Sequence, residues 1–278
     1  MKAGPAKMET AMATVQAVMQ SNRDLDKGDV RVVPLARGLA VLAAFSAEHP
    51  WMGNQEIAVE TGIPAPTVSR MLHSLAALGY VRYDEGRRKY RLASAALTLG
   101  YAAVSGDGVQ SAARIEMQKF ADASDTHVIL GARDRLDVIV NESQVGKNVY
   151  LDTHLAAGIR VPIASSPMGW ALLAALPERE RFYLQSNVER KSGRDWPSLR
   201  RQMAEGMSQL HQYGFCMSPC GRELASVAVP VCVPGHPSVV LASVGRSAGM
   251  NRARMERELG PRLAATAHAL EERLSTRH

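Results

Sequence analysis

The sequence predicts an α+β protein with two folded domains, and three observations support that prediction. A helical pattern over residues 62–78 is preceded by two more helical segments and followed by a basic hairpin pattern. The length of 278 residues leaves enough chain after residue 92 for a second hydrophobic core. Between residues 109 and 278, helix-like and strand-like patterns alternate. We therefore expect a small helical domain with a hairpin, joined to a larger mixed domain.

The first part of the chain predicts a flexible tail and then two helices. Residues 1–30 show no strong amphipathic period and are expected to form the tail. His49-Pro50 ends a helix predicted over residues 34–47. The helix is predicted by apolar residues at helical spacing: Leu35, Leu39, Leu42 and Phe45. Asn54 has the side chain of an N-cap for a second helix over residues 55–61, with Ile57 and Ala58 turned inward. Gly62 then ends that helix.

The third helix has two different faces. Its apolar face is formed by Val68, Met71, Leu72, Leu75 and Leu78. Its opposite face carries side chains that can form hydrogen bonds: Thr67, Ser69, Arg70, His73 and Ser74. Pro66 suits the first helical turn, and Gly79 suits the left-handed position after the helix. This is the pattern of a helix that reads the major groove, although an ordinary amphipathic surface helix has the same periodicity.

A hairpin pattern directly follows the third helix. Two β-rich runs, residues 80–83 and 88–92, flank a turn that contains glycine. Basic side chains at the tip are suited to contact phosphates: Arg87, Arg88 and Lys89. Three helices followed by a basic hairpin predict a winged helix-turn-helix domain over residues 31–92. The formal net charge of +6 agrees with nucleic-acid binding but does not establish it.

The remaining chain predicts a linker helix and a second domain. Residues 93–108 contain a helical pattern over 94–105, which either packs against a partner subunit or serves as a plain connector. In the second domain, residues 109–278, the predicted helices cover 112–124, 167–176, 179–185, 196–212 and 252–274. The predicted strands cover 126–133, 136–142, 148–153, 160–163, 214–217, 226–233 and 238–244. Ser165 or Ser166 caps the helix at residue 167, Pro177 ends it, and the polar stretch 189–194 separates the next two helices.

Composition and motifs favour some functional classes over others. No run approaches the roughly 18 apolar residues of a membrane span, and no secretory signal is visible, so we expect a cytoplasmic protein without a membrane partner. The three cysteines do not make a disulfide framework. The motifs of serine hydrolases, P-loop proteins, zinc proteases and dinucleotide-binding enzymes are missing from the sequence, so we expect no catalytic residues. A metabolite-processing enzyme with an appended winged helix is the alternative.

One cluster of residues could hold a metal. Zinc could be bound by Cys216, Cys220, Cys232 and His236, with His211 nearby. The spacing departs from the usual C-x2-C, and Cys232 continues an apolar strand pattern. Buried structural cysteines, or a redox-sensing thiol, are the alternatives. We expect no metal and no cofactor.

Short motifs in both domains follow the order and spacing of a known family. In the first domain they cover residues 37–42, 56–58, 61–64, 67–72, 79–81 and 90–92. In the second domain they cover residues 158–162, 169–174, 213–215 and 226–231. On these motifs the chain resembles the IclR family of transcriptional regulators along nearly its whole length after the tail.

The resemblance implies a winged-helix domain, a linker helix and a GAF-like domain for effector binding and oligomerisation. It implies dimers, or dimers of dimers, that bind a palindromic operator in double-stranded DNA, and a small organic or aromatic acid that alters this binding. Repression and activation both remain open. On the DNA side we expect Thr67, Ser69, Arg70 and His73 near bases or phosphates. The DNA backbone is expected to meet Arg87, Arg88 and Lys89.

The resemblance also places the effector over the helix that begins near Pro167, whose N-terminal amides favour a carboxylate. Carried over by position, the lining residues are Tyr150, Thr153, Pro167, Met168, Ser218, Ser226 and Ser243. This chain departs from the family pattern in two places. Residues 164–167 stand where His-Ala-Thr-Ala is typical, so Pro167 removes one anion-binding amide. Trp170 replaces a usual lysine. A polar lining without a ligand role is the alternative for each serine and threonine.

Overall fold

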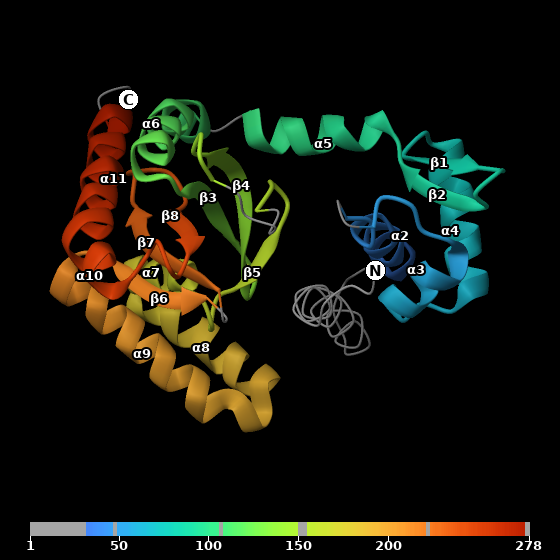
Figure 1. The fold of residues 1–278 in the computed structure, drawn as a ribbon. Helices are drawn as coiled ribbons and strands as arrows, with labels where there is room; N and C mark the ends of the chain where they lie inside the picture. Colours follow the sequence, from blue (N-terminus) through green and yellow to red (C-terminus); the bar gives the residue numbers. More distant parts are fainter. Residues whose placement is uncertain (1–31, 47–48, 106–107, 150–154, 221–222, 276–278) are drawn as a thin grey trace. The chain divides into compact units, whose positions relative to one another are not determined.

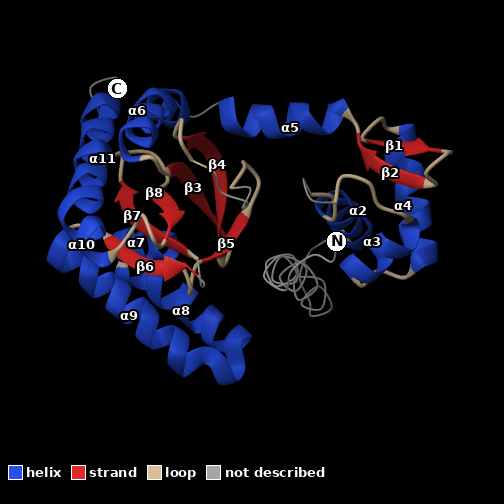
Figure 2. Ribbon diagram, in the orientation of Figure 1, coloured by secondary structure: helices blue, strands red, loops and turns tan. Residues whose placement is uncertain are grey.

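The computed structural model describes residues 32–46, 49–105, 108–149, 155–220 and 223–275. The chain divides into two compact units, Met1–Ala103 and Val104–His278. Helices and strands occur in both units, which confirms the α+β prediction (Figures 1 and 2). Within the described residues, no helix is both long enough and apolar enough to cross a membrane.

The first unit has the order predicted for a winged helix-turn-helix domain. Its described elements are α2 (Val33–Ala43), α3 (Asn54–Thr61), α4 (Ala65–Ala77), β1 (Val81–Asp84), β2 (Lys89–Leu92) and α5 (Ser94–Ser105). The hairpin strands pair antiparallel, with Val81 opposite Leu92. One small core joins the three helices to the hairpin, and its buried members include Val41, Ile57, Val68, Leu72 and, from β1, Val81.

The turns around α4 form where glycine permits a left-handed backbone. Gly62 has φ of 66° at the end of α3, and Gly79 has φ of 79° just after α4. Both helix ends were predicted from these residues. The Asn54 prediction is wrong, because Gly53 occupies the N-cap position. The backbone N–H of Gly53 donates to Oε2 of Glu56 at 2.6 Å, so a side chain from inside the helix caps its start.

The second unit is built on one antiparallel sheet with the strand order β5-β4-β3-β8-β7-β6. Its strands are β3 (His127–Asp134), β4 (Asp137–Val145), β5 (Arg160–Pro162), β6 (Cys216–Cys220), β7 (Leu224–Val231) and β8 (Val239–Arg246). Strands β3 and β8 are distant in sequence but pair in the middle of the sheet. The β3–β8 pairing therefore joins the two halves of this domain.

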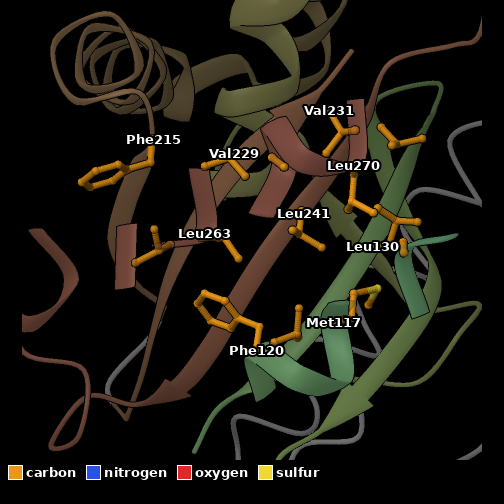
Figure 3. Close-up of a cluster of buried hydrophobic side chains, with 14 of the residues drawn as sticks. Met117, Phe120, Leu130, Phe215, Val229, Val231, Leu241, Leu263 and Leu270 are labelled. Carbon is orange, nitrogen blue, oxygen red and sulfur yellow. The ribbon is translucent and has the colours of Figure 1, made fainter. Parts of the chain in front are cut away.

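Helices cover both faces of the sheet (Figure 1). They are α6 (Gly108–Ser124), α7 (Pro167–Ala175), α8 (Glu178–Ser192), α9 (Trp196–Tyr213), α10 (Arg252–Arg254) and α11 (Gly260–Ser275). A π-helical segment, Met255–Leu259, joins α10 to α11. Figure 3 shows the core on the α6/α11 face, where Met117 and Phe120 of α6 and Leu263 of α11 surround Leu241 of β8. A second core lies between the other face and α7.

Two predictions for this unit are wrong. Asn148 and Val149 lie in a turn and not in the predicted strand 148–153, whose other residues lie outside the described chain. Helix α8 continues through Ser192, although the polar stretch 189–194 was expected to interrupt it. Leu184 and Val188 are buried one turn apart on the same helix face, and this packing outweighs the polar composition.

Candidate functional site

The exposed face of α4 forms the centre of the candidate DNA interface. Burial of Val68 and Leu72 against the core turns the opposite face of the helix outward. Ser69, Arg70 and His73 are exposed there, and Thr67 beside them is half-buried. Within the described chain, Arg70 takes part in no ion pair. Its guanidinium therefore has all its donors available for phosphates or for base edges.

The hairpin places two of the three predicted basic residues at its tip. Arg87 and Arg88 are exposed, and Arg88 has a positive φ of 54° in the turn. The backbone N–H of Arg87 donates to Oδ1 of Asp84 at 2.8 Å, which fixes the turn. The guanidinium of Arg87 lies over the ring of Trp51, with 4.8 Å between Cζ and the ring centroid.

Lys89, the third predicted contact, is already paired. Its Nζ lies 2.7 Å from Oε1 of Glu56 on α3. The hydrogen bond from the Gly53 backbone and then the one from Lys89 hold the pKa of Glu56 below its ordinary value. The carboxylate therefore stays ionised near neutral pH and ties the hairpin to α3.

In the second unit, polar residues form a row across the sheet on the face that α7 covers. Ser218 of β6 is opposite Ser226 of β7, which is opposite Val244 of β8. Val244 is in turn opposite His127 of β3. Directly opposed residues point to the same face of a sheet, and Val244 belongs to the core beneath α7. Ser218, Ser226 and His127 therefore share that face.

Two of these side chains are buried in different ways. Ser226 is 3 % exposed, and its Oγ has no hydrogen-bond partner among the described residues. His127 is 6 % exposed, and its Nε2 lies 2.6 Å from Oγ of Ser143. Burial lowers the pKa of His127, so the imidazole is neutral at pH 7. Neither His127 nor Ser143 is among the site residues predicted from the sequence, although His127 stands two residues before Ile129, at the spacing of one strand face.

Helix α7 begins beside this face with most of its first-turn amides already used. Pro167 has no N–H, and Ser166 accepts the N–H of Gly169 through Oγ at 3.1 Å. The N–H of Trp170 donates to the Ser166 carbonyl at 3.0 Å. Ser166 was one of the two predicted caps, and the structure confirms it. Met168 is buried beside these residues and packs close to β3, where a Cβ at Gly131 would come within 2.9 Å of its Cε.

The remaining predicted lining residues do not all join this group. Ser243 points to the α6/α11 face, where its Oγ donates to Oγ1 of Thr126 at 2.8 Å. Ser218 lies on β6, an edge strand, and its Oγ donates to the Pro219 carbonyl at 3.1 Å. Tyr150 and Thr153 lie outside the described residues. Of the predicted lining residues that the structure describes, Ser218 and Ser226 therefore share the α7 face of the sheet with His127, and Pro167 and Met168 begin the helix that covers this face.

The described cysteines and His236 do not form a metal site. No cluster of three or more potential ligands occurs in the part of the chain that the structure describes. Cys216 is buried, donates to the Gly206 carbonyl at 3.0 Å, and burial raises its pKa to about 12. Cys232 is exposed, and the side chain of Cys220 lies outside the described residues. Cys216 therefore remains a neutral thiol, unsuited to bind zinc or to act as a reactive thiolate.

Family models match both units. The model described as the IclR helix-turn-helix domain matches residues 34–85. The model described as the bacterial transcriptional regulator IclR C-terminal matches residues 101–276.

Individual proteins are similar over most of the chain. The HTH-type transcriptional regulator TsaQ1/TsaQ2 of Comamonas testosteroni is 30% identical over 242 residues, which are 86% of this chain and 87% of that protein. A solved IclR family transcriptional regulator from Brucella abortus is 34% identical with a TM-score of 0.77, over 89% of this chain and 96% of the other. An IclR homologue from Microbacterium hydrocarbonoxydans, solved with 4-hydroxybenzoate, shares the fold at 20% identity and a TM-score of 0.64, over 86% and 99%.

Proposed function

The chain belongs to the IclR family of ligand-responsive transcriptional regulators, and from this premise we propose how it binds DNA and its effector. It is a regulator and not an enzyme. We propose that residues 31–92 bind DNA, that residues 93–108 connect the two domains, and that residues 109–278 bind the effector and form the oligomer. The predicted tail, residues 1–30, lies outside the described residues. We also place the protein in the cytoplasm, where its DNA target is. The single observation that carries the proposal is the exposed hydrogen-bonding face of α4.

In the proposed DNA complex, α4 lies in the major groove. Its base and phosphate contacts are Thr67, Ser69, Arg70 and His73, and the hairpin supplies backbone contacts through Arg87 and Arg88. Lys89 is a secondary contact, because Glu56 already holds its ammonium. Two copies of the chain would place two α4 helices in successive major grooves, about 34–36 Å apart, and would select a palindromic operator.

Exposed apolar side chains support self-association. On α2 and at its N-cap they are Val32, Val33, Leu35 and Leu39, and on α5 they are Leu97, Leu99 and Tyr101. Leu35 and Leu39, and likewise Leu97 and Tyr101, lie one turn apart, and exposed apolar residues that share a helix face are typical of an interface between proteins. We propose that these two helices contribute to the interface of a homodimer, or to one of the interfaces of a dimer of dimers.

The proposed effector is a small organic acid bound on the α7 face of the sheet. The buried hydroxyl of Ser226 and the neutral imidazole of His127 offer hydrogen bonds to a carboxyl or phenol group. The relative solved with 4-hydroxybenzoate supports this ligand class. We assign Tyr150, Thr153, Pro167, Met168 and Ser218 to the same lining, and leave Ser243 out because it points to the other face.

The test of this function is selection from sheared genomic DNA by the purified full-length chain. We expect enrichment of fragments that share an inverted repeat, and a change in the bound fraction when 4-hydroxybenzoate or a related acid is added. A protein that enriches no sequence over a basic control protein contradicts the DNA-binding part. If fragments are enriched but none of the tested acids changes the bound fraction, the proposed effector class is contradicted.

A further inference from the structure

The outer face of the hairpin carries arginines and an aromatic ring that the DNA contacts described above do not use. Arg82 of β1 lies directly opposite Arg91 of β2. Met52 pairs with Tyr90 as a third strand position, with hydrogen bonds of 3.0 and 2.8 Å in the two directions. Met52 is buried in the core, so its neighbour Trp51 stands on the outer face beside Arg91.

The Trp51 ring holds two guanidinium groups at once. Cζ of Arg91 lies 5.3 Å from the ring centroid, and Cζ of Arg87 lies 4.8 Å from it. The two arginines come from different parts of the hairpin, the strand and the tip. Both therefore face an aromatic partner that attracts cations without neutralising them.

The positive charge on this face is not balanced by acids. Within the described chain, Arg82, Arg87 and Arg91 form no ion pair, whereas Lys89 is paired with Glu56. Arg82 and Arg91 lie directly opposite each other on neighbouring strands, and like charges in such a pair repel each other and destabilise the hairpin. An anion bound between them would relieve that repulsion. A stacked guanidinium also keeps its N–H edge free for phosphate oxygens.

We propose that Arg91 contacts a DNA backbone phosphate together with Arg87, and that Trp51 is the positioning residue for both. The proposal rests on the proposed DNA-binding function and extends its contact set to Arg91 on β2, supported by Trp51 from the loop between α2 and α3. Stacking on Trp51 orders two long side chains before DNA arrives. Less side-chain freedom is then lost on binding, which strengthens the complex.

The experiment measures how salt weakens binding of the full-length chain to a labelled DNA duplex of mixed sequence. For Arg91→Gln we expect the slope of log affinity against log salt to become shallower by about 0.9, the value of one phosphate contact. The matched control is Arg179→Gln on α8, which removes the same charge from an exposed position of the second unit and should keep the wild-type slope.

Two further variants test the positioning role. Trp51→Ala should weaken binding about 3- to 10-fold at fixed salt, and Trp51→Phe should restore most of that loss because a benzene ring still attracts guanidinium groups. Circular dichroism checks that each variant is folded. If Trp51→Ala does not fold, the positioning role is tested by comparing the DNA affinity of Trp51→Phe with that of Arg91→Gln.

The inference is overturned if Arg91→Gln keeps the wild-type slope, or if a folded Trp51→Ala variant binds as tightly as wild type. In the fallback comparison it is overturned if Trp51→Phe weakens binding as much as Arg91→Gln. Failure of the proposed function looks different. In that case the wild-type chain itself shows no salt-dependent binding to the duplex, before any substitution is made.

Discussion

Ser226 and Ser243 show how two serines on neighbouring strands can have opposite roles. Ser243 is fully buried and satisfied by Thr126, so its hydroxyl belongs to the structure of the sheet. Ser226 is buried on the other face, and no described residue pairs with its hydroxyl. A buried hydroxyl without a partner costs about 1–3 kcal/mol, which a ligand with a matching hydrogen-bonding group would recover.

We predict opposite effects of the two alanine substitutions on stability. Ser226→Ala should leave the free energy of unfolding unchanged or raise it by up to about 1 kcal/mol, because the unpaired hydroxyl is removed. Ser243→Ala should lower it by about 1–2 kcal/mol, because Thr126 loses one of its two hydrogen-bond partners and keeps only Ser124. Denaturant unfolding followed by circular dichroism measures both.

The same pair separates a ligand role from a structural one. Ser226→Ala should also lose the thermal stabilisation that a bound acid gives to the wild-type protein, whereas Ser243→Ala should retain it. A Ser226→Ala variant that is destabilised as much as Ser243→Ala would show that Ser226 has a structural partner and is not held for a ligand.

At the scale of elements, the sequence predicted the parts whose ends are marked by special residues. Gly62 and Gly79 mark the limits of the turn and helix around α4, and the hairpin follows from its β-rich runs. The face of each strand residue was harder to predict. A shift of one residue in register moves a side chain to the opposite face of the sheet. The register of β7 against β8 cannot be predicted from the sequence of either strand alone. For this reason Ser226 and Ser243 were expected in one site.

Trp170 illustrates a second limit of sequence-based prediction. Its replacement of a usual lysine was interpreted as a change in the effector site. The structure buries the Trp170 ring between α7 and α9, where its Nε1–H donates to the Ala164 carbonyl at 2.8 Å. Gly206 of α9 lies directly against the ring. This partner is 36 residues away in the sequence, so local pattern could not reveal it.

We predict that Gly206→Ala destabilises the second unit. A Cβ at residue 206 would overlap carbons of the Trp170 ring, and overpacking of this kind typically costs about 1–3 kcal/mol. The matched control is Gly100→Ala on α5, where a Cβ meets no atom of the described residues within 4 Å and should add up to about 1 kcal/mol of helix stability. Denaturant unfolding of both variants gives the comparison. Equal stability of the two would mean that α9 does not pack closely on Trp170.

At the scale of the whole molecule, the proposed DNA contacts need two copies of the chain. One α4 helix offers few base contacts, and specificity for a palindrome requires two helices that bind together. Exposed apolar side chains of α2 and α5 lie one turn apart on each helix, Leu35 with Leu39 and Leu97 with Tyr101. A single apolar residue of similar exposure, such as Val59 on α3, needs no such explanation.

We predict that charges on these helices break the assembly. The wild-type chain should have the mass of two or four copies in light scattering. Leu35→Glu combined with Leu97→Glu should reduce that mass at least by half at the same concentration. Val59→Glu, the control, should leave it unchanged. A wild-type chain that is already monomeric, or a double variant with unaltered mass, contradicts the role given to α2 and α5.

The most direct test of the central claim, that α4 reads the operator, compares Arg70→Ala with Arg179→Ala on an operator fragment recovered by the genomic selection. Fluorescence anisotropy measures the affinity of each variant at one salt concentration. Both variants lose one exposed positive charge, so an effect of the net charge of the chain alone would be equal. We predict that Arg70→Ala weakens binding by about 1–3 kcal/mol and that Arg179→Ala stays close to wild type. Equal affinities for the two variants would contradict the account.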